Sequence, residues 1–216
     1  MLWTADSVEY RSVSMYAAFS GETLIWIKST GGTPTVFNIK KVTKSSDISN
    51  GDTLVIGCPG YGVFVTDSLY TQAETGNPNM LWETEEKEIL GNYVTDITGL
   101  MTFKVVSRAT DYLGRWSITL QSNQYNYFLN RGRQFTQAFT RLFLTQSNLP
   151  SLFVKTSNGR IVMYGDEDDQ KYYLVARHNP GEASGLYEGL EFTPGATGTP
   201  PSGTQVCYFY KIQPVT

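Results

Sequence analysis

Short apolar runs alternate with polar, glycine-containing stretches along most of the chain. Runs of about four to eight residues rich in Val, Ile, Thr, Tyr and Phe are typical of β-strands. From residue 36 onward the runs form three units of one order: a strand, a turn, a second strand and then an aromatic-rich strand. The pattern predicts an all-β protein. The expected strands are 36–42, 52–56 and 61–65 in the first unit, 100–106, 116–120 and 125–129 in the second, 139–144, 152–156 and 172–176 in the third with an extra strand at 160–164, and a closing strand at 205–212.

Three units followed by a closing strand predict a β-trefoil-like domain, which we place at residues 32–216. The spacing between the first two units is widened by an insertion at about 67–99, which contains the acidic run 83–88. Long insertions in compact domains are often functional, and we expect this one to be an interface loop or a lid. Residues 81–90 are the one helical candidate in the sequence.

Residues 1–31 precede a break at Gly31-Gly32-Thr33-Pro34 and have a different organisation. Alternation at 8–14 and an apolar run at 23–27, separated by a Ser20-Gly21 turn, predict a β-hairpin arm. An isolated two-stranded hairpin is only marginally stable in water. The arm must therefore pack on the rest of the chain or on a partner.

The charge and hydropathy of the chain limit the classes of partner that it is expected to bind. The 216 residues include 17 Lys and Arg and 20 Asp and Glu, for a net charge of −3. The basic residues are scattered and form no stripe of the kind that nucleic-acid binding requires. No apolar run is long enough for a membrane span, and the first residues do not resemble a signal peptide. We expect a soluble protein with neither a nucleic-acid nor a membrane partner.

The sequence contains two cysteines, Cys58 and Cys207, which allow at most one disulfide. Both lie in apolar contexts, Val55-Ile56-Gly57-Cys58 and Val206-Cys207-Tyr208. We predict that they are buried free thiols, which fits folding in a reducing cytoplasm without excluding secretion.

Residues suited to catalysis or metal binding are few. His178 is the only histidine, and no Gly-x-Ser-x-Gly elbow or Gly-rich phosphate loop is present. We interpret His178 as a loop histidine that caps the end of a strand. The acidic run 166–169 has ligands that suit Ca²⁺, but it lacks the glycine and distal glutamate of an EF-hand, so the possibility of calcium binding stays open. The prediction is a non-enzymatic protein with no cofactor and no metal site.

Sugar binding is a more specific alternative to catalysis or metal binding. Tyrosine rings stack on the apolar faces of sugars, while amides and carboxylates bind their hydroxyl groups. Two clusters have this composition. The competing interpretation is that about half of these aromatic residues point inward as core. The candidate residues are Asn123, Gln124, Tyr125 and Tyr127 in the first cluster, and Asp169, Tyr172 and Tyr173 in the second.

Residues 36–213 resemble the β-trefoil modules of extracellular proteins from Bacteroidales. The resemblance is carried by the segment 43–56 (TKSSDISNGDTLVI), by 125–129 (YNYFL) and by 207–212 (CYFYKI). It implies a carbohydrate-binding module at a bacterial cell surface or outside the cell. The motifs are moderately specific for the fold and weak for any one function.

A second resemblance covers residues 8–28 only. The segments 12–16 (SVSMY) and 21–26 (GETLIW) are similar to a hairpin in virion proteins of tailed phages, the crAss-like gut phages among them. It implies a decoration or head-fibre protein of the virion. Tyr16, Leu24 and Trp26 of the arm would bind the major capsid protein or a neighbouring subunit, and a homo-oligomer is expected. This is our leading hypothesis, and host-surface glycans remain possible partners of the trefoil.

Overall fold

The computed structural model confirms the all-β prediction. The residues it describes are 17–20, 23–27, 36–58, 62–71, 79–110, 116–133, 140–148, 152–154, 159–163, 172–178, 187–194 and 204–215. Within these ranges the secondary structure is antiparallel strand, apart from the short 3₁₀ turn η2 (Ser45–Asp47). No helix in the described ranges has the length and apolar character needed to cross a membrane.

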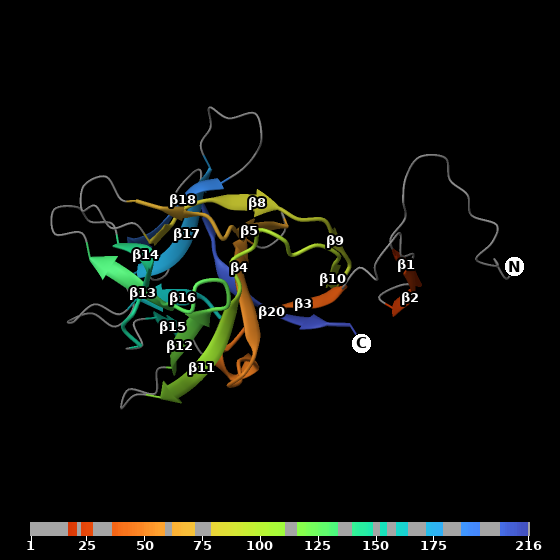
Figure 1. Ribbon diagram of the computed structural model, residues 1–216, viewed down its shortest axis with the longest axis horizontal. Coiled ribbons are helices and arrows are strands. Elements are labelled where there is room, and N and C mark those ends of the chain that lie inside the picture. The colour runs from red at the N-terminus through yellow and green to blue at the C-terminus, as the bar shows by residue number, and fades with distance from the viewer. Residues whose placement is uncertain are drawn as a thin grey trace, which may run out of the picture.

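In the described part of the chain, eighteen strands, β3 to β20, form a closed barrel. Figure 1 shows their arrangement. Near the place where the chain closes on itself, β20 lies between β3 and β4, because Lys211 pairs with Lys40 on one side and with Leu54 on the other. The barrel strands are β3 (Phe37–Lys41), β4 (Thr53–Cys58), β5 (Val63–Val65), β6 (Leu69–Tyr70), β7 (Met80–Leu81), β8 (Thr84–Glu86), β9 (Ile89–Leu90), β10 (Tyr93–Val94), β11 (Phe103–Thr110), β12 (Trp116–Ser122), β13 (Phe128–Arg133), β14 (Thr140–Thr145), β15 (Leu152–Val154), β16 (Ile161–Met163), β17 (Tyr172–His178), β18 (Tyr187–Pro194), β19 (Thr204–Val206) and β20 (Tyr208–Pro214).

The N-terminal arm contains a second, two-stranded sheet. β1 (Ala17–Ser20) pairs antiparallel with β2 (Thr23–Ile27), and neither strand pairs with the barrel. The expected strand 23–27 is therefore present. The expected strand 8–14 lies outside the described residues, and the partner of β2 is instead the segment 17–20.

The main core is called the inner cluster here. Every second residue along a strand points to the same face of the sheet, and the side chains on the inner face form this cluster. Leu54, Ile56 and Cys58 of β4 belong to it, as do Phe103 and Phe209, and all five are at most 2% exposed. Burial of this apolar surface is the main stabilising term of the fold.

An outer cluster lies on the opposite face of β4, because Val55 alternates with the inner residues. It contains Phe64 of β5 and Tyr210 of β20, whose rings meet edge to face at 5.5 Å between centroids. Gly57 makes this packing possible, since a Cβ there would lie 2.5 Å from the Phe64 ring and 2.8 Å from the Val63 carbonyl oxygen.

The segment 79–100, called the covering segment below, completes the barrel and covers the outer cluster. β7 pairs with β14, β8 with β5, and β10 with β3. Val94 and Leu100 are buried in the outer cluster, against which Ile89 and Ile97 pack. The helix expected at 81–90 is wrong: these residues form the short strands β7, β8 and β9, because each finds a strand partner that outweighs the local helical preference of its Glu and Lys residues.

Candidate functional sites

The connection between β12 and β13 holds the first group of candidate sugar-binding residues. The expected strand 125–129 begins only at Phe128, because residues 123–126 form a turn. The Ser122 hydroxyl accepts the backbone N–H groups of Gln124 and Tyr125, each at 3.2 Å. Asn126 adopts a φ of 60°, a left-handed conformation that asparagine tolerates well. The turn thus places its side chains outside the sheet.

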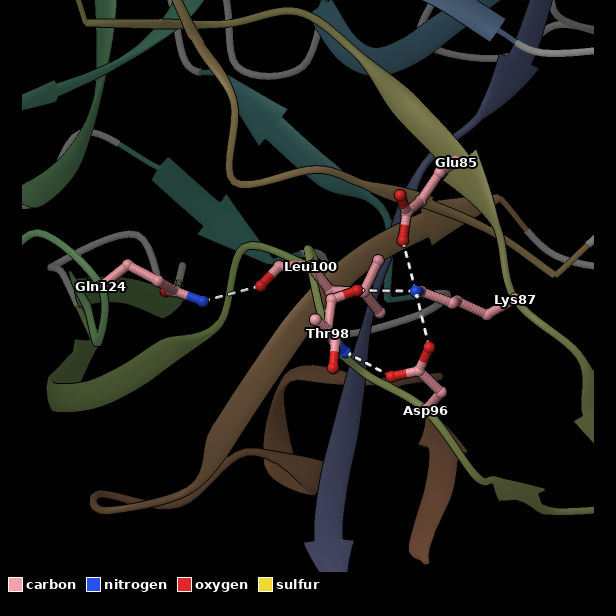
Figure 2. Close-up of polar contacts among 6 residues, drawn as sticks. All are labelled: Glu85, Lys87, Asp96, Thr98, Leu100 and Gln124. Atoms are coloured by element: carbon pink, nitrogen blue, oxygen red, sulfur yellow. Dashed lines mark hydrogen bonds and ion pairs between the residues drawn. The ribbon is translucent and has the colours of Figure 1, made fainter. Parts of the chain in front are cut away.

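Tyr125 and Asn123 are exposed on this turn but are held by hydrogen bonds. The Tyr125 side chain is 41% exposed, and its hydroxyl donates to the backbone carbonyl of Asp67 at 2.8 Å. The Asn123 amide donates to the Thr102 hydroxyl at 3.0 Å. Gln124 joins the turn to the segment before β11, since its side-chain amide donates to the Leu100 carbonyl at 2.7 Å (Figure 2). The result is a fixed aromatic face beside exposed amides.

Of the other candidate sugar-binding residues, the two that the structure describes, Tyr127 and Tyr173, do not join this surface. Tyr127 is partly buried against the inner cluster. Tyr173 is 2% exposed and packs with Val162 and Val175, with the Arg160 guanidinium 5.0 Å from its ring centroid. A ring this deeply buried has no accessible face for a sugar. Tyr173 is therefore a core residue, as the competing interpretation expected for about half of these aromatic residues. The side chain of Tyr172 and all of Asp169 lie outside the described residues.

The candidate docking residues of the arm are described in part. Leu24 and Trp26 lie on β2, where they pair with Phe19 and Ala18 of β1. Tyr16 lies outside the described residues, as do the side chains of β1 and β2.

A polar network around Lys87, which sequence reasoning missed, holds the covering segment together (Figure 2). The Lys87 ammonium lies 2.5 Å from Glu85 and 3.4 Å from Asp96, and it donates to the Thr98 carbonyl at 2.6 Å. Burial alone would lower the pKa of Lys87, but the contacts with Glu85 and Asp96 outweigh it and raise that pKa. The Thr98 backbone N–H is the main cause of a lowered pKa at Asp96. We interpret the network as structural, because its charged groups contact one another, although Glu85 Oε1 has no hydrogen bond beyond its ion pair with Lys87.

A polar cavity of about 320 Å³ opens where β3 and β20 pair. Its lining consists of Asn38, Lys40, Lys41, Val42, Lys211 and Gln213, with Asp47 contributed by η2. The Lys41 ammonium lies 3.6 Å from the centroid of the Tyr208 ring. Sequence reasoning missed this site because Lys40 and Lys211 are far apart in the chain, and only the closure of the barrel makes them neighbours. The sequence did contain one signal. Each of the two strands carries a lysine and an amide two positions apart, Asn38 and Lys40 in one and Lys211 and Gln213 in the other.

The structure gathers few groups for catalysis or metal binding. In the described ranges no three His, Cys, Asp or Glu side chains come together as possible metal ligands. The acidic run 166–169 lies outside those ranges, so the calcium hypothesis is untested. His178 is the last residue of β17, so it belongs to the strand and not to the loop in which we expected it. Cys58 and Cys207 are free and buried, which confirms the expectation for both thiols.

Comparison of the chain with protein-family models, with curated proteins and with solved structures finds no match.

Proposed function

We propose that the protein is a non-enzymatic structural protein of a tailed-phage virion, a decoration or head-fibre component attached through its N-terminal arm. The observation that carries the proposal is that β1 and β2 form a sheet of their own, without pairing to any barrel strand. A two-stranded sheet of four and five residues is too small to be stable unaided, so a partner surface is its natural support. The resemblance of residues 8–28 to virion hairpins supplies the identity of that partner.

We further propose that the barrel is a β-trefoil that faces outward from the particle. The three repeated units and the closing strand β20, which joins β3 and β4, support this finer description. The barrel has its own buried core and would fold without the arm. The arm would then attach the protein to the particle, and the barrel would form its outward-facing part.

Incorporation into particles tests the attachment. We expect Trp26→Ala in the full chain to reduce incorporation strongly, since tryptophan is the residue most enriched at interface hot spots. Deletion of residues 1–31 should abolish incorporation while leaving the circular dichroism spectrum of the barrel unchanged. The matched control is Val106→Ala, which removes an apolar side chain that is 43% exposed on the barrel. Normal incorporation of the deletion variant would refute the proposal.

A second candidate function is carbohydrate binding by the β12–β13 turn, as in a surface module of a Bacteroidales cell. The exposed Tyr125 ring, held through its hydroxyl and flanked by Asn123, favours it. On a glycan array, Tyr125→Ala should abolish binding. Tyr125→Phe keeps the ring and loses only the hydrogen bond to Asp67, so it should retain most of the binding. An array without any bound glycan would exclude this function.

A further inference from the structure

The cavity between β3 and β20 has an unusual arrangement of charge. Lys40 and Lys211 are direct cross-strand partners, and like charges placed opposite each other destabilise an antiparallel pair. Asp52 neutralises Lys211 through an ion pair of 2.9 Å. In the described part of the chain, no carboxylate pairs with Lys40, whose side chain is exposed at the cavity.

Asp47 is the acid in the cavity lining, and one of its carboxylate oxygens is engaged at the η2 turn. One Asp47 carboxylate oxygen accepts the Thr43 N–H at 3.0 Å, the Thr43 hydroxyl at 2.9 Å and the Lys44 N–H at 3.1 Å. These bonds fix the carboxylate at the η2 turn, away from the role of a partner for Lys40. The amides of Asn38 and Gln213 form the next cross-strand pair on the same face of these two strands, one pair beyond Ile39 and Ile212. The wall of the cavity therefore presents a row of ammonium groups beside a row of amides.

We propose that this cavity binds a compact oxyanion, a carboxylate or a sulfate, carried on a small hydroxyl-rich molecule such as an acidic sugar. The anion would lie between the ammonium groups of Lys40 and Lys211, where it relieves their repulsion. The amides of Asn38 and Gln213 would bind neighbouring hydroxyls, since each amide both donates and accepts. The volume of about 320 Å³ suits one or two sugar rings. The site is separate from the arm and from the Tyr125 turn.

Saturation-transfer NMR on the full chain tests the site, with glucuronate and glucose as probes at equal concentration. We expect transfer to glucuronate and none to glucose, and we expect inorganic sulfate to displace glucuronate. Lys40→Gln removes the unpaired charge without breaking an ion pair and should weaken glucuronate binding about tenfold, the usual effect of one charge-assisted hydrogen bond. Lys104→Gln is the control, because Lys104 pairs with Thr53, which pairs with Ile212 of the outer cluster, on the opposite face of the sheet.

Three results would overturn the proposal. They are the absence of transfer to glucuronate, a failure of sulfate to compete, and an equal loss of binding in the two lysine variants. The last would mean that net charge, and not this cavity, attracts the anion. The glucuronate test and the incorporation test are independent. If the cavity fails to bind glucuronate but deletion of residues 1–31 still abolishes incorporation, only the cavity proposal is refuted and the virion proposal stands.

The cysteine pair carries a second inference. Cys58 at the end of β4 and Cys207 before β20 have their sulfur atoms 3.8 Å apart, although 149 positions separate them in the chain. Both side chains are at most 2% exposed. Burial, together with the neighbouring Cys58, raises the pKa of the Cys207 thiol, so the folded protein contains little thiolate there. The two sulfurs are close enough to join, yet protected from oxidants once the barrel is closed.

We infer that Cys58 and Cys207 form a disulfide when the chain folds under oxidising conditions, and that the folded, reduced protein resists the same oxidation. With glutathione disulfide as the oxidant, the two protein thiols lose two electrons and two protons to form the S–S bond. Glutathione disulfide takes up both and gives two glutathione molecules. The bond would join β4 to the start of β20 inside the barrel.

Expression in an ordinary bacterial cytoplasm and in a strain with an oxidising cytoplasm tests this inference, with thiols counted by alkylation in denaturant and mass spectrometry. We expect two alkylated cysteines from the first and none from the second. Reduced, folded protein exposed to glutathione disulfide should keep both thiols for hours. The oxidised form should unfold about 10 °C higher, since the bridge closes a long loop, and Cys207→Ser should lose this difference. Two free thiols after oxidising expression, or rapid oxidation of the folded protein, would refute the inference.

Discussion

The inner and outer clusters of the barrel are both buried, but they are built differently. The inner cluster takes most of its residues from the long strands β4, β11, β12, β14 and β17, together with Phe209 of β20. The outer cluster packs residues of β3, β4 and β20 against Phe64 of β5 and against the segment that contains the two-residue strands β9 and β10. Long strands fix a core by their own register, whereas short strands need additional contacts to stay in place.

Those additional contacts are polar. Lys87 joins Glu85, Asp96 and Thr98, and its backbone N–H donates to the Gly62 carbonyl at 2.7 Å. The difference teaches that the covering segment is held by a few specific groups, while the barrel interior is held by the sum of its apolar contacts. Mutations can separate the two.

The largest expected effect is at the inner cluster. Phe103→Ala removes a fully buried ring and should lower the free energy of unfolding by about 4 kcal/mol, because the surrounding strands cannot collapse into the cavity. Phe64→Ala in the outer cluster removes a ring of equal size that is 1% exposed. It should cost about 3 kcal/mol, since the short covering strands can move inward. Urea denaturation measures both, and a larger loss for Phe64→Ala would reverse the comparison.

A smaller effect is expected where the outer cluster meets β4. Gly57→Ala should destabilise the protein by about 1–3 kcal/mol, because its Cβ would overlap the Phe64 ring and approach the Val63 carbonyl oxygen. Phe64→Leu in the same chain should recover part of this loss by removing the ring. Additive losses in the double variant would show that the two positions do not interact, contrary to the packing.

The polar network gives the next effect. Lys87→Met keeps the length of the side chain but leaves Glu85 and Asp96 without their shared cation, and the Thr98 carbonyl without its donor. We expect a loss of about 1–2 kcal/mol by urea denaturation, together with faster hydrogen exchange in residues 84–100 than in β4. Lys104→Met, at an exposed strand position, should change the free energy of unfolding little. Uniform exchange across both regions would mean that the network does not hold the covering segment.

How far the sequence predicts the molecule follows the same division. The long strands β4, β11, β12 and β20 are predicted to within a few residues, because their alternation is a local property. The strands β6 to β10 were missed, since two or three residues give no period and their pairing depends on distant partners. The eight-residue strand β18 was missed as well, so length alone does not decide which strands are predicted. The same holds for the sites. The exposure of Tyr125 and the burial of Tyr173 depend on a turn and on packing that periodicity does not contain, and Lys40 meets Lys211 only when β20 closes the barrel.

The smallest expected effect is on acid stability, and it depends on the η2 turn. Burial alone would raise the pKa of Asp47, but the Thr43 and Lys44 hydrogen bonds lower it. A carboxyl whose pKa is lower in the folded state stabilises the fold above its unfolded pKa, about 3.8, and loses that contribution as the pH falls through the folded value. Asp47→Asn should therefore be less stable than the parent by about 0.5–1 kcal/mol at pH 7, the usual contribution of a turn cap. The gap should close as the pH falls below about 4. Asp96, whose pKa is also lowered, is unchanged in both proteins and cancels from the difference. Thermal unfolding of the two proteins from pH 7 to pH 2.5 measures the gap, and a constant gap across that range would show that the Asp47 charge contributes nothing to the turn.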